Sequence, residues 1–168
     1  MIPKLDVLFL NLHRRCLNYE ARHGGFLGIY YLSAFLRKEG YEAKGFAGTF
    51  LEGTRFADGF CSADNVSMIG LYCDYDNVNE NIFLSRRIKE RYNLPVIVSG
   101  PQAATLDEKF FRESKCDAVV LGEGELTVRE LARLFLDGSG ELEKIHGIVY
   151  PTDSGLVKTP ARSPIKKS

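Results

Sequence analysis

Two turns in this chain combine glycine with small polar or acidic side chains, and each directly follows a short apolar run. The two turns are Ser99, Gly100, Pro101, Gln102 and Gly122, Glu123, Gly124, Glu125. Glycine permits backbone conformations that a side chain forbids and lets a ligand approach closely. Serine and glutamine add uncharged hydrogen-bonding groups. The turns predict binding through shape and neutral hydrogen bonds rather than acid–base catalysis, although simple strand ends and well-capped helix starts would have similar residues.

A third polar segment follows the apolar run 66–72 and contributes Leu71, Tyr72, Cys73 and Asp74 to the candidate site. With Asp76 it forms an acidic cluster that, in receiver domains, helps to bind magnesium. A receiver also needs paired acids after its first strand, whereas the first apolar run here ends Leu-Asn-Leu-His13. We therefore predict no metal ligand and no catalytic residue in this chain.

The glutamates of the 122–125 turn also bear on the class of ligand. Acidic side chains are favoured at a helix N-terminus by about 0.3–1 kcal/mol, but they repel phosphate there. The chain has no GxxxxGK[ST] motif and no GxGxxG motif after its first apolar run. A phosphate-rich nucleotide is therefore disfavoured.

A basic loop after the first apolar run contains further candidates. Its residues are His13, Arg14, Arg15, Cys16, Arg22 and His23. A Cys/His pair or a metal site is conceivable, but the spacing matches no ligand template. The loop either contacts a ligand or is a solvated basic rim, and His146 is interpreted as structural.

Hydrophobic periodicity predicts the elements that carry these turns. Strands are expected at 5–10, 41–46, 66–72, 95–99 and 118–121, and helices at 26–39, 78–92, 105–114 and 126–136. The first helix shows apolar spacing through Leu27, Tyr30 and Tyr31, and the third is expected to start with Thr105 as N-cap and Glu108 in a capping box. A short helix is expected within 47–65, where the pattern is weak, and an edge hairpin at 145–150 and 155–159.

This alternation predicts an α/β fold, a doubly wound parallel five-stranded sheet with helices on both faces plus a C-terminal edge hairpin. The turns lie where parallel strands end, which is the edge where open α/β sheets bind ligands.

Composition narrows the function classes further. The 168 residues include 22 basic and 22 acidic side chains, which argues against nucleic-acid or anionic-membrane partners. No apolar run approaches the roughly 20 residues that span a bilayer, and the start of the chain lacks a signal-peptide cleavage site. The four cysteines are dispersed without a CxxC pair. We expect a cytoplasmic protein without disulfides.

Several segments resemble the N-terminal cobalamin-binding domain of radical S-adenosylmethionine enzymes. The helix 26–39 with Gly40, the strand 66–72 and the turn 95–102 are similar to conserved segments of that family. The most specific likenesses are Asp-Ala-Val-Val-Leu-Gly-Glu-Gly-Glu at 117–125 and Ile-His-Gly-Ile-Val-Tyr at 145–150. The resemblance covers roughly residues 4–165.

The resemblance implies a flavodoxin-like (Rossmann-like) sheet with the corrin across the carboxyl ends of the strands and the nucleotide tail at the switch point. The implied cofactor-binding residues are Gly25, Leu27, Leu71, Tyr72, Cys73, Asp74, Ser99, Gly100, Pro101, Gln102, Gly122, Glu123, Gly124 and Glu125. The Asp-x-His-x-x-Gly loop of related modules is absent, because neither His13 nor His23 has an aspartate two residues before it. Cobalamin is therefore expected without a protein histidine on cobalt.

The same resemblance assigns S-adenosylmethionine and a [4Fe-4S] cluster to a separate catalytic domain, because CxxxCxxC spacing is absent from this chain. It divides the chain into a cobalamin-binding domain (1–144), the edge hairpin (145–159) and a linker toward that catalytic domain (160–168). The chain alone is then an accessory domain. A cofactor-free docking module of the same fold, or a flavodoxin- or receiver-like domain, are the alternatives.

Overall fold

A computed structural model describes residues 3–13 and 27–163. The strands are β1 (Leu5–His13), β2 (Ala43–Thr49), β3 (Val66–Tyr72), β4 (Val96–Ser99), β5 (Ala118–Val120), β6 (Ile148–Thr152) and β7 (Gly155–Lys158). The α-helices are α2 (Leu27–Lys38), α3 (Phe50–Ser62), α4 (Val78–Tyr92), α5 (Glu108–Ser114) and α6 (Glu125–Asp137). Short 3₁₀ turns are η2 (Ala103–Thr105) and η3 (Leu142–Lys144).

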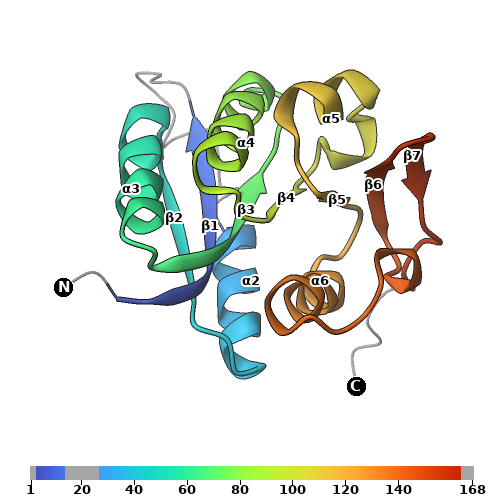
Figure 1. Ribbon diagram of the computed structural model, residues 1–168, viewed down its shortest axis with the longest axis horizontal. Coiled ribbons are helices and arrows are strands. Elements are labelled where there is room, and N and C mark those ends of the chain that lie inside the picture. Colours follow the sequence, from blue (N-terminus) through green and yellow to red (C-terminus); the bar gives the residue numbers. More distant parts are fainter. Residues whose placement is uncertain (1–2, 14–26, 164–168) are drawn as a thin grey trace.

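The strands form one seven-stranded sheet in the order β2-β1-β3-β4-β5-β6-β7. Strands β1 to β5 are parallel, and β6 and β7 continue the sheet in antiparallel pairing. Helices α3, α4 and α5 cover one face, and α2 and α6 cover the other (Figure 1). This is the predicted doubly wound fold with its hairpin at the edge of the sheet.

The central strands are apolar on both faces because each face is covered by helices. Along β1, Leu8 and Leu10 belong to the core under α3, α4 and α5, whereas Val7 and Phe9 belong to the core under α2 and α6. Side chains alternate between faces along a strand, so every second residue of β1 returns to the same core.

Two helix starts differ from the sequence-based prediction. The segment 47–65, whose helical periodicity is weak, contains a full helix, α3, because Thr49 and Glu52 make a capping box at its start. The predicted capping box at Thr105 is wrong: Thr105 lies in η2 and donates its hydroxyl to the Gln102 carbonyl oxygen. Helix α5 starts later, with the Asp107 carboxylate accepting a hydrogen bond from the amide of Phe110.

The apolar face of α2 also differs from the prediction. Leu27, Tyr30 and Tyr31 are exposed, and the helix buries Ile29, Leu32, Ser33 and Leu36 instead. The Ser33 hydroxyl is accommodated in the core because it donates to the Ile29 carbonyl one turn earlier. Phe35, which belongs to the same apolar spacing, is half-buried and packs against the core, so the apolar residues of α2 lie on both its solvent side and its core side.

The segment after β7 returns along α6. The amide of Gly147 donates to the carbonyl of Pro160, and the Arg162 guanidinium binds the Thr127 hydroxyl and pairs with Glu130. These contacts hold the end of the described chain against α6. Within the described residues, no helix has the length and apolar character needed to cross a membrane.

Candidate functional site

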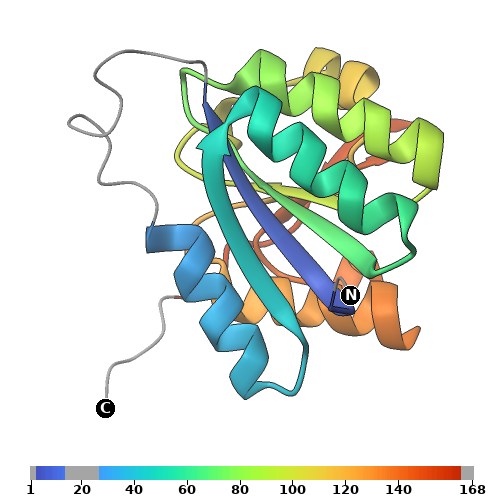
Figure 2. The same ribbon diagram turned by 90° about the vertical axis from the view of Figure 1, so that its left-hand side faces the viewer.

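The candidate site lies between the carboxyl ends of β1 and β3, where the chain order of the sheet reverses. From β1 the chain proceeds through α2 to β2 on one side, and β3 lies on the other side. Figure 2 shows the β2 and β1 strands rising to this edge, with α2 on one face and α3 and α4 on the other. In open α/β sheets such a reversal is where ligands bind, and we use the word crevice for the space outside the ends of β1 and β3.

One row of side chains crosses the α2- and α6-facing side of the sheet at this level. Asn11 pairs with Ala47 on β2, and Tyr72 pairs with Ser99 on β4. Leu10 pairs with Leu71, so Asn11 and Tyr72 are the next residues on adjacent strands. We call Asn11, Tyr72 and Ser99 the polar row. Two residues earlier on the same strands, Phe9 and Ile97 are core residues. The side chains on this face therefore change from apolar to polar at the strand ends.

The most unusual member of the polar row is Asn11. Its residue is 1% exposed, yet its Oδ1 atom has no hydrogen-bond partner among the described residues. An unpaired buried amide costs about 1–3 kcal/mol. Water or a bound ligand are the usual partners of a polar atom left unpaired in such a position.

The two strands at the crevice are joined by Asn77. Its Nδ2 donates to the carbonyl oxygens of Leu12 on β1 (2.9 Å) and Tyr72 on β3 (3.0 Å). Its Oδ1 accepts from the amide of Asp74 and from Nδ2 of Asn81. Asn77 is 1% exposed, so these hydrogen bonds are shielded from solvent, and they fix the spacing of the two strand ends.

Two glycines border the crevice where helices start. A Cβ on Gly28, in the first turn of α2, would lie 3.5 Å from the Tyr72 ring. A Cβ on Gly124, before α6, would lie 3.3 Å from Cδ2 of Leu32 on α2. The two helix starts therefore bring backbone rather than side chains to this side of the sheet.

Gly100 closes the turn after β4 for a packing reason. Its φ is +119°, and a Cβ there would lie 2.4 Å from the carbonyl oxygen of Cys73. The amide of Cys73 donates to the Ser99 carbonyl, and the amide of Gln102 donates to the Cys73 carbonyl. The two turns are thus bound backbone to backbone, which only glycine at position 100 permits.

Not all predicted site residues reach the crevice with their side chains. Leu71 and Cys73 are buried in the core under α3, α4 and α5, on the opposite face from the polar row. Asp74 is 8% exposed, and its carboxylate accepts from the amide of Asp76. These three residues therefore support the turn, whereas Tyr72 and Ser99 face the crevice.

The remaining predicted residues lie along the rim. Pro101, Gly122 and Glu123 are exposed, whereas Gln102, Gly124 and Glu125 are half-buried. Gln102 Oε1 accepts a hydrogen bond from the Thr105 hydroxyl, which fixes the amide locally. Gly25 lies outside the described residues, as do Arg14, Arg15, Cys16, Arg22 and His23.

The sequence reasoning missed Asn11, Gly28 and Asn77. Asn11 had a signal: it is a polar residue within Leu-Phe-Leu-Asn-Leu, a run otherwise buried on both faces. The sequence contains no such signal for Gly28 and Asn77, because their roles depend on contacts with residues that are distant in the sequence.

The rim also carries exposed apolar side chains. Leu27 begins α2 and is 76% exposed, and Tyr75 follows β3 and is 70% exposed. Tyr31, in the second turn of α2, and Leu51, at the start of α3, are also exposed. Apolar groups around a crevice favour a ligand or partner with apolar surface.

The described cysteines are not suited to nucleophilic chemistry. Burial raises the pKa of Cys61, of Cys73 and of Cys116 to about 12, so each remains a thiol at neutral pH. Within 3–13 and 27–163, no three His, Cys, Asp or Glu side chains gather as a possible metal site.

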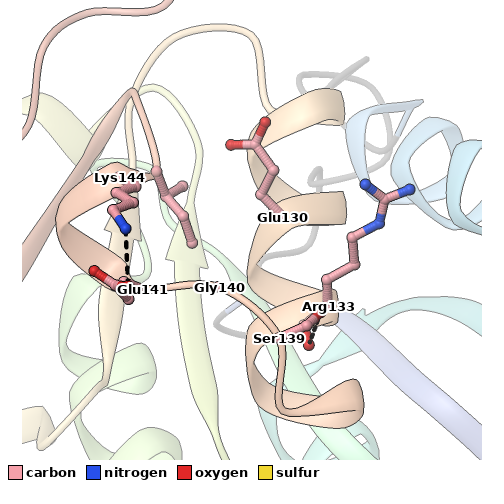
Figure 3. Close-up of a pocket in the computed structure, with 7 residues that line it drawn as sticks. Glu130, Arg133, Ser139, Gly140, Glu141 and Lys144 are labelled. Carbon is pink, nitrogen blue, oxygen red and sulfur yellow. Dashed lines mark hydrogen bonds and ion pairs between the residues drawn. The ribbon is translucent and has the colours of Figure 1, made fainter.

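A hollow of about 320 Å³ lies away from the strand ends, between α6 and the η3 turn (Figure 3). Lys144 pairs with Glu141 at 2.9 Å, and Glu130 pairs with Arg162. Arg133 lies 4.0 Å from Glu39. The charged side chains that line the hollow are thus paired, either with one another or with residues outside the hollow.

Comparison with known proteins shows which domain family this chain is similar to. The family model described as "B12 binding domain" matches residues 24–132. An uncharacterized methyltransferase of Pyrococcus horikoshii, PH0819, is 37% identical over 87 residues, which are 51% of this chain and 16% of that protein.

Two solved structures have the same fold. The radical S-adenosylmethionine methyltransferase TsrM from Kitasatospora setae, with cobalamin and a [4Fe-4S] cluster bound, matches with a TM-score of 0.76 and 19% identity over 98% of this chain and 30% of that one. The cobalamin-dependent radical enzyme OxsB, with aqua-cobalamin and S-adenosylmethionine bound, matches with a TM-score of 0.68 and 23% identity over 96% and 23%. This chain spans less than a third of the length of each of these proteins. Because the family model covers more than half of the chain, the protein belongs to the B12-binding domain family.

Proposed function

We propose that this domain binds cobalamin at the carboxyl ends of its strands and presents it to a radical S-adenosylmethionine domain. The observation that carries the proposal is the polar row at the β1/β3 crevice, with the buried and unpaired Oδ1 atom of Asn11. The family assignment and the cobalamin-bound structures of the same fold support it.

The residues fit this group in chemistry and shape. Cobalamin has a broad corrin ring fringed by neutral amides, with a narrower nucleotide tail. The glycine turn at 99–102 offers backbone groups and the neutral side chains of Ser99 and Gln102, and the turn at 122–125 offers backbone groups beside two glutamates. The exposed Leu27 and Tyr75 side chains suit the apolar faces of a flat ring.

Bound cobalamin supplies a cobalt centre able to carry a transferable group. The residues of this chain bind and orient it: Asn77 fixes the strand ends, and Gly100 holds the 99–102 turn against the 72–77 turn. S-adenosylmethionine and the [4Fe-4S] cluster belong, in this proposal, to the second domain. Residues 160–168 form the linker toward it, and Arg162 fixes where that linker leaves α6.

We further propose that no histidine of this chain binds cobalt. The Asp-x-His-x-x-Gly motif is absent, and the turns facing the crevice from β3, β4 and β5 contain no histidine. His146 contributes its carbonyl oxygen to Thr127 and Arg162, which fixes its backbone at the start of β6.

Titration of the purified chain with hydroxocobalamin tests both proposals, that the chain binds cobalamin and that none of its histidines binds cobalt. We expect a change in the cobalamin absorption spectrum and a measurable heat of binding. His13→Ala and His23→Ala should bind with unchanged affinity and give the wild-type spectrum. Loss of the spectral change in either variant would contradict the absence of a histidine ligand, and no binding by the wild-type chain would contradict cobalamin binding itself.

A second function is favoured by the exposed apolar side chains of the rim. Leu27, Tyr31 and Tyr75 could contact a partner domain directly, without cofactor, in a docking module of the same fold. A folded chain that binds no corrinoid in the titration would support this alternative.

A further inference from the structure

We propose that Arg162 is a positioning residue for the 122–125 turn, which it holds in the binding conformation through Thr127 and Gly147 without touching the ligand. Arg162 lies in residues 159–163, the segment that follows β7, which we call the strap. The inference rests on the proposed function, because it gives one turn of the candidate site a support that lies outside that site. It starts from the contacts of the strap with the starts of α6 and β6.

The strap is bound to the start of β6 by its backbone. The amide of Thr159 donates to the carbonyl of Ile148 at 3.0 Å, and the carbonyl of Pro160 accepts from the amide of Gly147 at 2.9 Å. The Thr159 hydroxyl accepts a further hydrogen bond from the amide of Ile148, and Thr159 is buried. The strap therefore has a fixed place beside the start of β6.

The Arg162 side chain reaches α6 from this place. Its Nε donates to the Thr127 hydroxyl at 2.9 Å. Its Nη2 pairs with Glu130 and donates to the His146 carbonyl at 3.4 Å. The Arg162 side chain is 17% exposed, so solvent screens these contacts little. The planar guanidinium can serve all three acceptors at once, and it thereby joins the first two turns of α6 to the backbone that leads into β6.

Gly147 is the residue at which the strap, α6 and the site turn meet. A Cβ at this position would lie 3.3 Å from the Leu121 carbonyl oxygen, 3.5 Å from the Thr127 hydroxyl oxygen and 3.6 Å from Cβ of Arg162. The carbonyl of Gly147 also accepts from the amide of Leu121 at 2.8 Å. The backbone that enters the turn therefore lies directly against the residues that hold the strap, with no side chain of residue 147 between them.

The 122–125 turn is held at its two ends. Leu121 is bound to the start of β6, and the Gly124 carbonyl accepts from the amide of Val128 in α6 at 2.7 Å. Between these ends Gly122 has a φ of +71°, and no described residue lies within 4 Å of its Cβ position. Glycine is the residue with the greatest conformational freedom, so the segments at its ends set the conformation of the turn. The contacts of Arg162 reach both segments.

A turn that is already ordered binds a ligand more tightly than one that must first be ordered. The apparent affinity falls in proportion to the fraction of the protein in the binding conformation. Loss of the Arg162 contacts lowers this fraction and leaves the ligand contacts of the ordered turn unchanged. Linkage requires the reverse effect as well, so a bound corrinoid protects the strap by the same factor.

The experiment compares the full wild-type chain with Arg162→Met, which keeps a side chain of similar length and removes the guanidinium donors. Arg87→Met is the matched control. Arg87 is also a half-buried arginine that binds a carboxylate, that of Asp58, but it lies on α4, on the other face of the sheet (Figure 1).

Backbone hydrogen exchange without ligand is the first readout. We expect Arg162→Met to raise the exchange rates of the Leu121 and Gly147 amides about fivefold relative to those of β3, the effect of one hydrogen bond. Arg87→Met should leave this ratio unchanged, because its contacts lie on the opposite face. A residue that contributes only to overall stability would change all protected amides alike.

Titration with hydroxocobalamin is the second readout. Arg162→Met should bind about fivefold more weakly than the wild type, and Arg87→Met should keep the wild-type affinity. Thr127→Val removes the hydroxyl that accepts from Arg162 and keeps the shape of the side chain. The losses of Thr127→Val and Arg162→Met should not add in the double variant, because the two residues act through one contact. Thr127→Val also carries the exchange test if Arg162→Met does not fold.

Unchanged exchange at Leu121 in Arg162→Met would overturn the inference, and so would an equal rise in Arg87→Met. Wild-type affinity of Arg162→Met, or fully additive losses with Thr127→Val, would overturn it as well. If the wild-type chain binds no hydroxocobalamin, the proposed function itself fails, and the exchange rates alone then decide whether Arg162 positions the turn.

Discussion

At the scale of single residues, the crevice depends on one glycine and one hydrogen-bonded asparagine that hold its borders in place. Gly100 allows the backbones of two turns to touch, and Asn77 joins the carbonyl ends of two strands. Neither residue is chemically reactive. Their effect is to place the polar row at a fixed spacing, which is what binding through shape requires.

Gly100→Ala should destabilise the domain by about 3 kcal/mol, because the new methyl group would meet the Cys73 carbonyl and the positive φ would be strained. Chemical denaturation measures this change. Gly59→Ala is the matched control: nothing lies within 4 Å of its Cβ position, and it lies inside α3. Alanine there should stabilise by about 0.5–1 kcal/mol. Equal effects of the two variants would show that the turn contact at Gly100 is unimportant.

At the scale of elements, α3 and α4 are held together across the sheet face by Asp58. Arg87 contacts it through both Nε (3.2 Å) and Nη2 (2.8 Å), and the Tyr92 hydroxyl donates to the same carboxylate at 3.1 Å. The hydrogen bond from Arg87 is the largest cause that lowers the pKa of Asp58. The carboxylate is therefore bound more tightly when it is charged.

The pH dependence of stability follows from the lowered pKa of Asp58. A lowered pKa in the folded state contributes stability above the ordinary value of about 3.9, and that stability is lost as pH falls through the folded pKa. Asp58→Asn should cost about 1 kcal/mol at neutral pH, and the difference from wild type should shrink below about pH 4.

Urea denaturation of both proteins between pH 3 and pH 7 measures the difference. Asp153→Asn, in the exposed turn between β6 and β7, is the control and should leave the stability unchanged at every pH. A difference between wild type and Asp58→Asn that persists undiminished at pH 3 would contradict the assigned pKa direction.

At the scale of the whole molecule, the crevice belongs to the central strands, so ligand binding should stabilise the entire domain. Binding to the folded state alone adds about 2.7 kcal/mol at a ligand concentration of 100 Kd. For a domain of this size, that corresponds to a rise in Tm of about 5–10 °C. Calorimetry with increasing hydroxocobalamin measures the shift.

The increase in Tm should continue with the logarithm of ligand concentration, as mass action requires. A nucleotide such as ATP, which the glutamates at 123 and 125 disfavour, is the control and should leave Tm unchanged. A Tm that does not respond to hydroxocobalamin would contradict binding at the central strands.

The sequence by itself determined the strand and helix order, because periods of 2 and about 3.6 residues are local patterns that burial imposes. It predicted β3 and α4 with their observed bounds, since each has an abrupt change from apolar to polar residues at its ends. It also placed the glycine turns at the carboxyl edge of the sheet, because parallel strands share one direction.

Only the tertiary structure decided which face of the sheet carries the site and which side chains reach it. Leu71, Tyr72 and Cys73 are consecutive, yet only Tyr72 lies with Asn11 and Ser99 on the α2 and α6 face. Leu12 and Asn77 lie 65 positions apart in the chain, yet the Asn77 side chain donates a hydrogen bond to the Leu12 carbonyl oxygen near the end of β1. A crevice is formed by contacts between distant segments, and the local pattern of a sequence contains no record of those distances.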